Sequence, residues 1–280
     1  MITADLHIHT IASDGSWTPV QLVDNIREMG IQVFAVTDHD SVGSVAATAQ
    51  LAKQYDLCFL PGVEVCSTSR GHQFHILGYG IDFQSHQLQC LLQHNTQLME
   101  ETDRQCIRQL AARRLPGVDY NEYLGYRYKA ERGGWKSLNY LMDKGLCQGV
   151  KDFFERLFTT ENEIQFPEFP APVAVIDTIR SAGGVAVLAH PGSEFHGTVL
   201  EETLECFYEE SIDGVECFHP GHDRDTTAMA REWCLRHQLL MTGGSDCHGS
   251  FVPGRRLGHP QINLADLNLG RILQVDKSPL

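Results

Sequence analysis

The first residues of the chain that could do chemistry are two histidines close to its start. His7 and His9 lie in the segment Asp5-Leu6-His7-Ile8-His9, where apolar and polar residues alternate. Such alternation predicts a short β-strand, on which residues two apart point to the same side. Both imidazoles and the Asp5 carboxylate are therefore expected on one face, poised to bind one metal ion or two neighbouring ones. A lone His-x-His is as often a hydrogen-bonded surface pair, so the rest of the chain has to decide.

Further residues of metal-binding type lie at or just beyond the carboxyl ends of predicted strands. Imidazole nitrogens and carboxylate oxygens are donors for Zn, Mn or Fe. The complete set, with the opening pair included, is His7, His9, His39, Glu64, His75, His190, His219, Asp246 and His248. Nine such donors exceed what one ion requires, so we expect a cluster of two or three divalent transition metal ions. Glu64 is the natural bridging carboxylate.

An alternation of strands and helices would bring these residues to one edge. Besides the opening segment, strands are predicted over 32–37, 57–65, 73–80, 185–189, 214–218 and 239–242, with 57–65 broken by Pro61-Gly62. Helices are predicted over 19–29, 43–55, 173–182, 199–210, 224–237 and 264–273. About seven strands separated by helices indicate an α/β fold with parallel pairing, a closed or nearly closed β/α barrel. Chemistry in such barrels is done at the rim formed by the carboxyl ends of the strands.

The alternation stops over 85–170, which we interpret as an inserted subdomain between the barrel segments 1–84 and 171–280. The insert is mostly helical, with a long helix over 87–114 and shorter pieces near Asn121, Ser137 and Lys151, and 166–172 forms a stiff exit linker. Eleven of the 22 Lys and Arg residues lie between Arg104 and Arg156, with only six acids among them. This basic segment could face an anionic ligand as a lid that sets selectivity, or it could be a solvated helical surface.

Composition excludes several classes of protein. A hydrophobic fraction of 42% fits a globular chain with a substantial core, and a net charge of −14 argues against stable binding of duplex nucleic acid. No apolar run is long enough for a transmembrane helix, and the first residues do not resemble a signal peptide. The nine cysteines are scattered without a Cys-x-x-Cys pair, which fits reduced thiols and a cytoplasmic location.

Five motifs together resemble those of the polymerase and histidinol phosphatase (PHP) family. They are Asp5-Leu6-His7-Ile8-His9-Thr10, Thr37-Asp38-His39-Asp40, Gly62-Val63-Glu64, Ala189-His190-Pro191 and Ser245-Asp246-x-His248. They occur in the family's order along the whole expected barrel and leave out the insert. The resemblance is greatest to small bacterial phosphoesterases that act on nucleoside 3′,5′-bisphosphates, nucleotides and short RNA 5′ ends. It implies a distorted (β/α)7 barrel, similar to a TIM barrel, whose rim binds three metal ions, manganese foremost, with zinc or iron as alternatives.

The resemblance also implies a distribution of the metal ligands. One ion would take His7, His9, Glu64 and Asp246; a second would take Asp14, His39 and His248; a third would share Glu64 with His75 and His190. Asp5 and Asp38 are better interpreted as acceptors that orient a histidine. Histidines without motif support are expected at the surface, namely His72, His86, His94, His196, His237 and His259.

The expected activity is hydrolysis of a phosphate monoester of a small nucleotide-like substrate by a metal-bridging hydroxide, without a nucleophilic Ser or Cys. The catalytic candidates are Asp14, His39, Asp40, His219 and His222, although a hydrogen-bonded loop role for His219 and His222 stays open. Where the subgroup is expected to carry an Arg-Pro-His-type segment, this chain has Arg132-Gly133-Gly134-Trp135-Lys136. Arg132 and Lys136 are candidate phosphate clamps, Trp135 is a candidate base platform, and His222 is a further substrate contact.

Several other functions remain open from the sequence. A 5′–3′ exonuclease on short single-stranded RNA or DNA and a histidinol-phosphate phosphatase would use the same ions. A metal-dependent amidohydrolase also opens with His-x-His, but it usually needs a bridging lysine at a strand end, where this chain has Glu64. A PHP module without activity is disfavoured because all nine candidate ligands are present.

Overall fold

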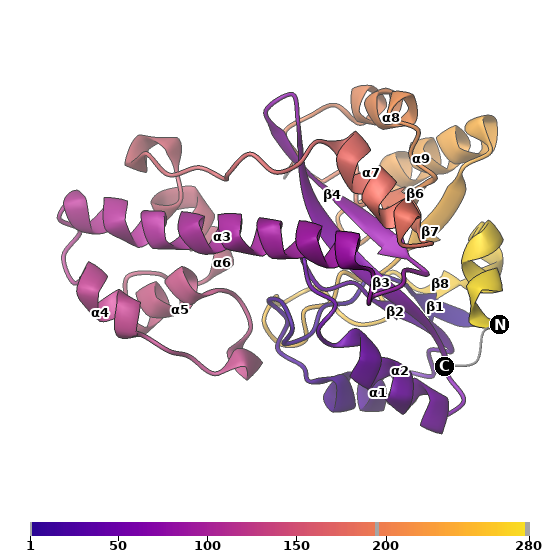
Figure 1. The fold of residues 1–280 in the computed structure, drawn as a ribbon, viewed down its shortest axis with the longest axis horizontal. Coiled ribbons are helices and arrows are strands. Elements are labelled where there is room, and N and C mark those ends of the chain that lie inside the picture. The colour runs from indigo at the N-terminus through magenta and orange to yellow at the C-terminus, as the bar shows by residue number, and fades with distance from the viewer. Residues whose placement is uncertain (1, 194–195, 278–280) are drawn as a thin grey trace.

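The strands form one sheet that curls into a nearly closed barrel. The computed structural model describes residues 2–193 and 196–277. The strands are β1 (Thr3–Asp5), β2 (Val33–Val36), β3 (Cys58–Ser69), β4 (His72–Tyr79), β5 (Val185–Leu188), β6 (Gly214–Phe218), β7 (Leu240–Gly243) and β8 (Ile262–Asn263). Their order is β7-β6-β5-β4-β3-β2-β1-β8 (Figure 1). The residue after β1 approaches β7, because the N–H of Leu6 donates to the carbonyl of Gly243 at 3.1 Å. The predicted α/β barrel with helices is therefore confirmed.

Two details of the predicted sheet are wrong. β4 runs antiparallel to both β3 and β5, so the barrel is not uniformly parallel. β3 continues unbroken through Pro61-Gly62, because the glycine is needed for close packing and not for a turn. A Cβ at Gly62 would lie 2.8 Å from the carbonyl oxygen of Val36 on β2. Only a residue without a side chain allows the two strands to pair there.

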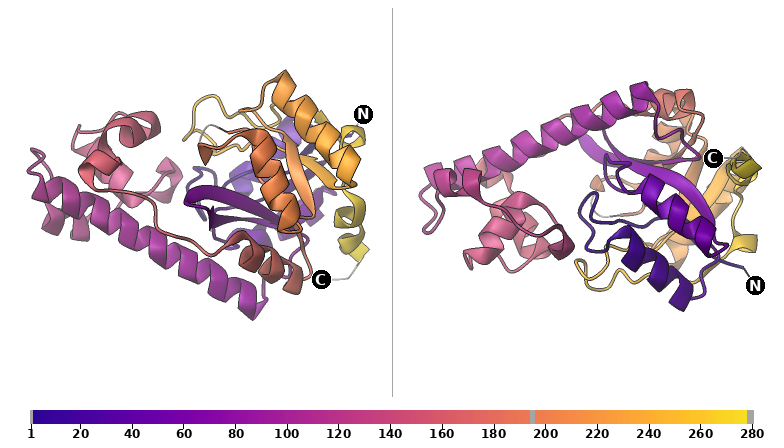
Figure 2. Two further views of the ribbon diagram at one scale, coloured as in Figure 1. Left: turned by 90° about the horizontal axis from the view of Figure 1, so that it is seen from above. Right: turned by 60° about the horizontal axis from the view of Figure 1, so that its bottom comes forward.

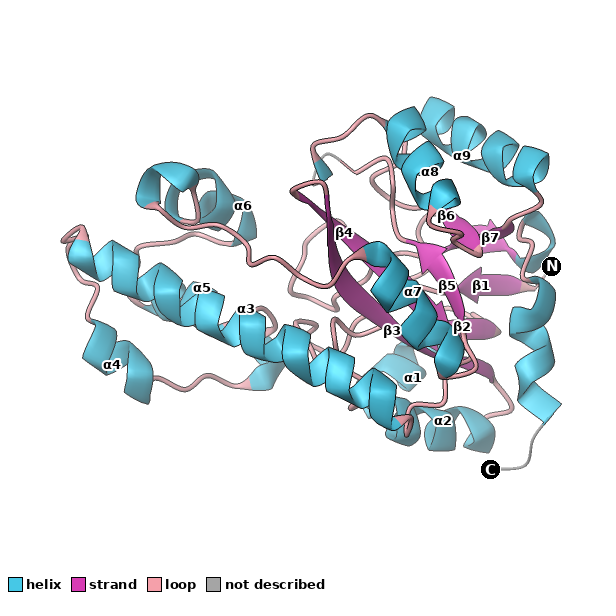
Figure 3. Ribbon diagram, turned by 45° about the horizontal axis from the view of Figure 1, so that its top comes forward, coloured by secondary structure: helices cyan, strands magenta, loops and turns pink. Residues whose placement is uncertain are grey.

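The barrel has an apolar interior and a helical outer layer, with alternate strand residues facing each. On β2, Val33 and Ala35 belong to the interior cluster, whereas Phe34 and Val36 pack outward with the residues of two helices. The helices of this layer are α1 (Pro19–Glu28), α2 (Val45–Gln54), α7 (Pro172–Ser181), α8 (Leu200–Glu209) and α9 (Arg224–His237). Figure 3 shows α7, α8 and α9 over one side of the sheet and α1 and α2 at another. α1 begins as predicted, with Thr18 as N-cap in a capping box and Pro19 at the first position.

The helix predicted over 264–273 does not form as one α-helix. The chain there makes the short strand β8 and two 3₁₀ helices, Leu264–Asp266 and Gly270–Lys277. Pairing with strands holds the backbone extended: β8 is antiparallel to β1, and Asn268 bridges to Met241 on β7. Leu269 and Ile272 then fill the barrel interior.

The residues between β4 and α7 form a separate group of helices. These are α3 (His86–Ala112), α4 (Tyr120–Gly125), α5 (Lys136–Asp143) and α6 (Val150–Asp152), with a 3₁₀ turn at Ala130–Arg132 and a π-helical turn at Phe153–Leu157. α3 starts against the barrel and extends away from it, and α4, α5 and α6 gather beside its far half (Figure 2). Their own hydrophobic cluster includes Ile107, Tyr123, Leu141 and Phe153. Among the described residues, no helix is both long and apolar enough to cross a membrane.

Candidate metal centre

Most of the predicted ligands meet at one end of the barrel. One donor atom from each residue lies within 4.8 Å of the others in three groups: His7, His9, Glu64 and Asp246; His9, Asp14, His39 and His248; and Glu64, His75 and His190. The structure thus brings together every residue of the predicted ligand distribution, whereas His219 belongs to none of these groups. The three groups agree with the predicted distribution among ions, except that His9 also belongs to the second group.

Glu64 lies at the centre of this arrangement. Its Oε2 is 3.0 Å from Nε2 of His7 and 3.1 Å from Nε2 of His9. Its Oε1 is 3.0 Å from Nδ1 of His75 and from Nε2 of His190. Because the carboxylate is fully buried and its two oxygens face different histidines, it is placed to bridge two ions.

The strand direction explains two differences from the expected positions. Glu64 is in the middle of β3, and His75 is in the amino-terminal half of β4, so neither lies at a carboxyl end. Since β4 is antiparallel, its amino end lies at the same edge as the carboxyl ends of its neighbours. Cross-strand pairing sets His75 opposite Cys66, two residues beyond Glu64 on the same face. His75 therefore lies at the predicted edge of the barrel. It reaches this edge because β4 is antiparallel, and not because it follows the carboxyl end of a parallel strand.

Several ligands follow their strands in an unusual backbone conformation. His190, two residues after β5, has φ 27°, and Asp246 has φ 49°, both in the left-handed region. Such strain costs about 1–3 kcal/mol per residue and is common at functional sites. Gly244 precedes Asp246 and allows its loop to approach the first strand, because a Cβ there would lie 2.3 Å from the backbone N of His7. The loop after β7 is therefore shaped to deliver Asp246 to the histidines of the opening segment.

The charges of the cluster shift its titration strongly. Burial lowers the pKa of His9, but the nearby carboxylates of Asp246 and Glu64 outweigh burial and raise that pKa to about 10. Burial instead dominates at His39 and lowers its pKa to about 3. Burial raises the pKa of Glu64, yet the charges of His39 and His7 hold it well below its usual value. Neighbouring cationic groups thus oppose the effect of burial and favour the ionised form of Glu64.

The donor atoms fit divalent cations. Both ring nitrogens of His9 and Nδ1 of His39 are buried and lack a hydrogen-bond partner among the described residues. Nε2 of His9 nevertheless lies 3.0 Å from Oδ1 of Asp246. These two potential metal ligands are therefore close together but not aligned for a hydrogen bond. Unpartnered imidazole nitrogens that face carboxylate oxygens form a donor set suited to a divalent ion.

Asp5 and Asp38 do not orient an imidazole as predicted. Asp5 accepts from the backbone N–H groups of Ser245 and Gly258, and Asp38 accepts from Thr10 and from the hydroxyl of Ser44. The partners of these two carboxylates are backbone N–H groups and hydroxyls of nearby loops, and not imidazole rings. They stabilise the loops that carry the ligands.

The carboxylate that orients a histidine is Glu216, which sequence reasoning missed. Its Oε1 lies 2.9 Å from Nδ1 of His7, and its Oε2 accepts from the backbone N–H of His190 at 2.8 Å. Glu216 is fully buried within β6, between Val215 and Cys217. A charged residue inside an apolar buried strand needs a partner. The glutamate between Val215 and Cys217 in the sequence was therefore the feature that could have predicted this role.

The predicted surface location of His196 is also wrong. Its side chain is buried, with Nδ1 on the carbonyl oxygen of Gln73 and Nε2 on that of His190. Contact with the backbone of a ligand residue places His196 behind the metal centre. No periodicity or motif in the sequence predicts this position.

The remaining predicted catalytic residues differ in their surroundings. Nε2 of His219 lies 3.2 Å from Oδ2 of Asp246, beside the cluster. His222 lies farther out, with Nδ1 on the carbonyl of Cys217 and Nε2 accepting from the N–H of Gly192.

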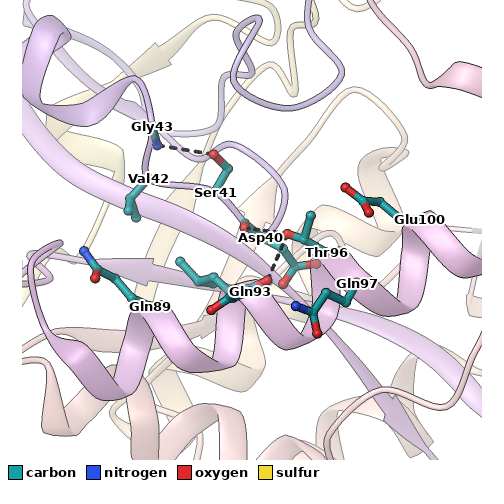
Figure 4. A pocket seen from close by; sticks show the side chains of 10 residues that line it. Asp40, Ser41, Val42, Gly43, Gln89, Gln93, Thr96, Gln97 and Glu100 are labelled. Carbon is teal, nitrogen blue, oxygen red and sulfur yellow. Dashed lines mark hydrogen bonds between the residues drawn. The ribbon is translucent and has the colours of Figure 1, made fainter.

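Asp40 is held from the side of α3. Asn95 donates to its carboxylate at 2.7 Å, and burial raises the pKa of Asp40 to about 6. The residue also lines a cavity of about 500 Å³ between the segment 40–43 and α3, together with Gln93 and Thr96 (Figure 4).

The three predicted substrate contacts in 85–170 are occupied by neighbours. Arg132 pairs with Asp143, Nζ of Lys136 donates to the carbonyl of Leu124, and Trp135 packs against Phe153, Phe154 and Phe251. The turn between Arg132 and Trp135 does reach the metal centre, because the N–H of Gly134 donates to the carbonyl of Asp14 at 2.7 Å.

Comparisons with known proteins agree with this site. Residues 5–135 match the PHP domain family. The chain is 29% identical to a 3′,5′-nucleoside bisphosphate phosphatase of Chromobacterium violaceum, covering 93% of this chain and 92% of the relative. It is 31% identical to the 5′-3′ exoribonuclease Rnm of Escherichia coli, covering 87% of this chain and 84% of the relative.

Two solved structures share the fold over nearly the whole chain. One, assigned as a metal-dependent phosphoesterase from Bifidobacterium adolescentis, superposes with a TM-score of 0.79 at 25% identity and covers 91% of each chain. The other is described as an amidohydrolase from Chromobacterium violaceum with bound sulfate and no metal. It superposes with a TM-score of 0.81 at 28% identity and covers 97% of this chain and 95% of its own.

Proposed function

Because the chain belongs to the PHP family of metal-dependent phosphoesterases, we propose that it removes a phosphate group from a small nucleotide-like substrate such as a nucleoside 3′,5′-bisphosphate or monophosphate. Hydrolysis of a phosphoester is common to the named activities of its relatives. The observation that carries the proposal is the convergence of three donor groups on one edge of the barrel, with Glu64 shared between two of them.

We assign the ions to the three groups of donors that the geometry defines. His7 and Asp246 would hold the first with His9 and Glu64; Asp14, His39 and His248 would hold the second; His75 and His190 would hold the third with Glu64. Manganese is the proposed native ion, with zinc or iron as alternatives. Divalent ions held there supply Lewis acidity toward phosphoryl oxygens and lower the pKa of water.

His219 is the residue best placed to move a proton. Its Nδ1 accepts from the N–H of Gly221 at 3.0 Å, which leaves the proton of the neutral ring on Nε2 beside Asp246. Because this ring is buried beside the cluster, we propose that His219 donates a proton to the leaving oxygen of the substrate. Both nitrogens of His222 are used by backbone groups, and we assign that residue to positioning its loop.

We propose that 85–170 is an inserted subdomain that covers the substrate between the barrel segments 1–84 and 171–280. Three contacts support this role: the bond from Gly134 to Asp14, and the packing of Gly133 and Trp135 against Phe251. Arg132 and Lys136 become phosphate clamps in this proposal only by exchanging their present partners for the substrate. The protein would work in the cytoplasm, where its nine free cysteines stay reduced.

The test is phosphate release by the manganese-loaded protein from a panel of substrates. The panel contains nucleoside 3′,5′-bisphosphates, nucleoside monophosphates, histidinol phosphate, 5′-phosphorylated oligonucleotides and an amide. Greatest kcat/KM on a bisphosphate or monophosphate, lost in His9→Ala and Asp246→Ala, supports the proposal. Processive release of mononucleotides from oligonucleotides would favour an exonuclease, and turnover of the amide alone would overturn the proposal.

A further inference from the structure

Cys66 lies beside the donor cluster and has no part in the proposed reaction. It follows Glu64 by two residues on β3, so both side chains point to the same face of the strand. The antiparallel register of β3 and β4 pairs Cys66 with His75, and opposed residues of such a pair also share a face. Cys66 as a whole is 8% exposed. Backbone geometry alone therefore delivers a sulfur atom to the edge of the metal centre.

The thiol belongs to a fourth set of donor atoms. Sγ of Cys66 and one ring nitrogen each from His39 and His75 lie within 4.8 Å of one another. Nδ1 of His39 is buried and has no hydrogen-bond partner among the described residues, although a Glu64 oxygen lies 3.3 Å away. Three donors on two strands and one loop thus converge without any contribution from Asp14, Asp246 or His248.

This set differs chemically from the other three. A thiolate is a soft donor that favours Zn²⁺, Co²⁺ and Cd²⁺, whereas carboxylate-rich sets suit Mn²⁺. One sulfur and two imidazoles make a three-ligand set of the kind that holds Zn²⁺ in open sites. We propose that His39, Cys66 and His75 form a thiophilic binding position for a divalent ion such as Zn²⁺, a proposal that rests on the metal centre assigned under the proposed function. Binding releases the thiol proton to solvent as the sulfur–metal bond forms.

The position shares ligands with the proposed manganese sites. His39 also belongs to the group with Asp14, and His75 to the group with Glu64 and His190. One ring nitrogen cannot ligate two ions at once, so an ion on Cys66 competes with its two neighbours for the imidazoles of His39 and His75. Zn²⁺ bound at this position therefore reduces the number of Mn²⁺ ions that the neighbouring groups can hold. Through Cys66, the metal content of the protein depends on the concentration of zinc.

The experiment is a Co²⁺ titration of the metal-free full-length protein, followed by absorption. Sulfur–cobalt bonds give charge-transfer absorption in the near ultraviolet, which nitrogen and oxygen ligands do not. We expect this band in the wild-type protein, its removal by Zn²⁺ and its absence in Cys66→Ser. The serine variant should also bind Zn²⁺ at least about tenfold more weakly at this position, with Mn²⁺ affinity nearly unchanged. No band in the wild-type protein, or a band retained in Cys66→Ser, overturns the proposal.

Two other cysteines serve as controls. Sγ of Cys247 accepts from the N–H of Gly249 and packs in the core between two ligand residues, and Cys90 is exposed on α3. Cys247→Ser and Cys90→Ser should keep the band. If Cys66→Ser does not fold, cadmium NMR of the wild-type protein decides, since a thiolate ligand shifts the resonance far from that of nitrogen and oxygen sites. A thiolate band without phosphoesterase activity would sink the proposed function alone, and activity without the band would sink this inference alone.

Discussion

Nδ1 of His7 lies 2.9 Å from Oε1 of Glu216, and neither side chain is exposed to solvent. The contact fixes which nitrogen of His7 is available. Glu216 holds Nδ1, so Nε2, which lies 3.0 Å from a Glu64 oxygen, is the nitrogen that would ligate an ion. Glu216 also accepts from the backbone N–H of His190, and it thereby holds two ligand residues from different strands.

Glu216→Gln should weaken metal binding without unfolding the protein. The amide nitrogen would donate to Nδ1 of His7 and move the ring proton to Nε2, where it blocks coordination. Loss of such an orienting partner typically costs about 10–100-fold in metal affinity. Competition with a chromophoric chelator measures this directly. Unchanged affinity in the variant would show that Glu216 only fills space, and exposed Glu209→Gln is the matched control.

Metal loading should stabilise the fold. Glu64 and Asp246 stay charged beside one another, and ions that bind only the folded chain relieve that repulsion. At 100 times its Kd, one ion adds about 2.7 kcal/mol, which raises Tm by about 5–10 °C in a chain of this size. Thermal melting with chelator and with Mn²⁺ measures the difference. The same increase in a His9→Ala/Asp246→Ala double variant would contradict binding at this site.

The sequence predicted the site well where local rules decide the position of a residue. His39 and His190 each come shortly after the carboxyl end of a short buried strand, where the strand-end rule predicts them. Thr18 and Pro19 likewise started α1 as predicted. These features depend on neighbours in sequence, which hydrophobic patterns and capping preferences describe.

Rules that use only neighbouring residues do not predict how strands distant in the sequence pair. The direction of β4 and the continuity of β3 depend on partners in the sheet, and Gly62 looked like a turn although close packing against Val36 requires it. Glu216 was missed because its partners, His7 and His190, are far away in sequence. The nearness of Cys66 to His75 follows from the same unpredicted register.

Arg255 should contribute to phosphate binding. Its guanidinium contacts Oδ2 of Asp246, and its side chain is 36% exposed, so part of its fork stays open toward solvent at the rim. Arg255→Met should raise KM about tenfold, the scale of one charge-assisted hydrogen bond, with a smaller effect on kcat. Steady-state kinetics on the best substrate of the panel tests this. An equal effect from Arg256→Met, the exposed neighbour, would point to general surface charge instead.

Gly134→Ala should separate the insert from the rim. The residue has φ +70°, and a Cβ would lie 2.7 Å from the ring of Phe251. The change should break the bond from its N–H to Asp14 and raise KM several-fold, since the cover closes less well. Gly145→Ala is the matched control, because that residue has φ +68° with nothing within 4 Å of a Cβ. Backbone strain of about 1–2 kcal/mol is common to both variants, so equal kinetics would contradict a role for this contact.

Asp103 should make the insert less stable as pH rises. Its carboxylate is buried on α3, where it accepts from the hydroxyl of Tyr123 and the N–H of Ser137. Burial outweighs these bonds and raises the pKa of Asp103 above its ordinary value of 3.8. The folded chain therefore binds this proton more tightly than the unfolded chain, and stability falls as pH rises from the unfolded value through the folded one.

Asp103→Asn removes the titration and keeps an oxygen that accepts both bonds. Its free energy of unfolding should equal that of the wild-type protein near pH 4 and exceed it at pH 7, because only the carboxylate becomes charged. Urea denaturation across this range measures the difference, with Glu100→Gln on the exposed side of α3 as control. An advantage of the asparagine variant that is independent of pH would show that packing, and not the charge of Asp103, limits the stability of this helix pair.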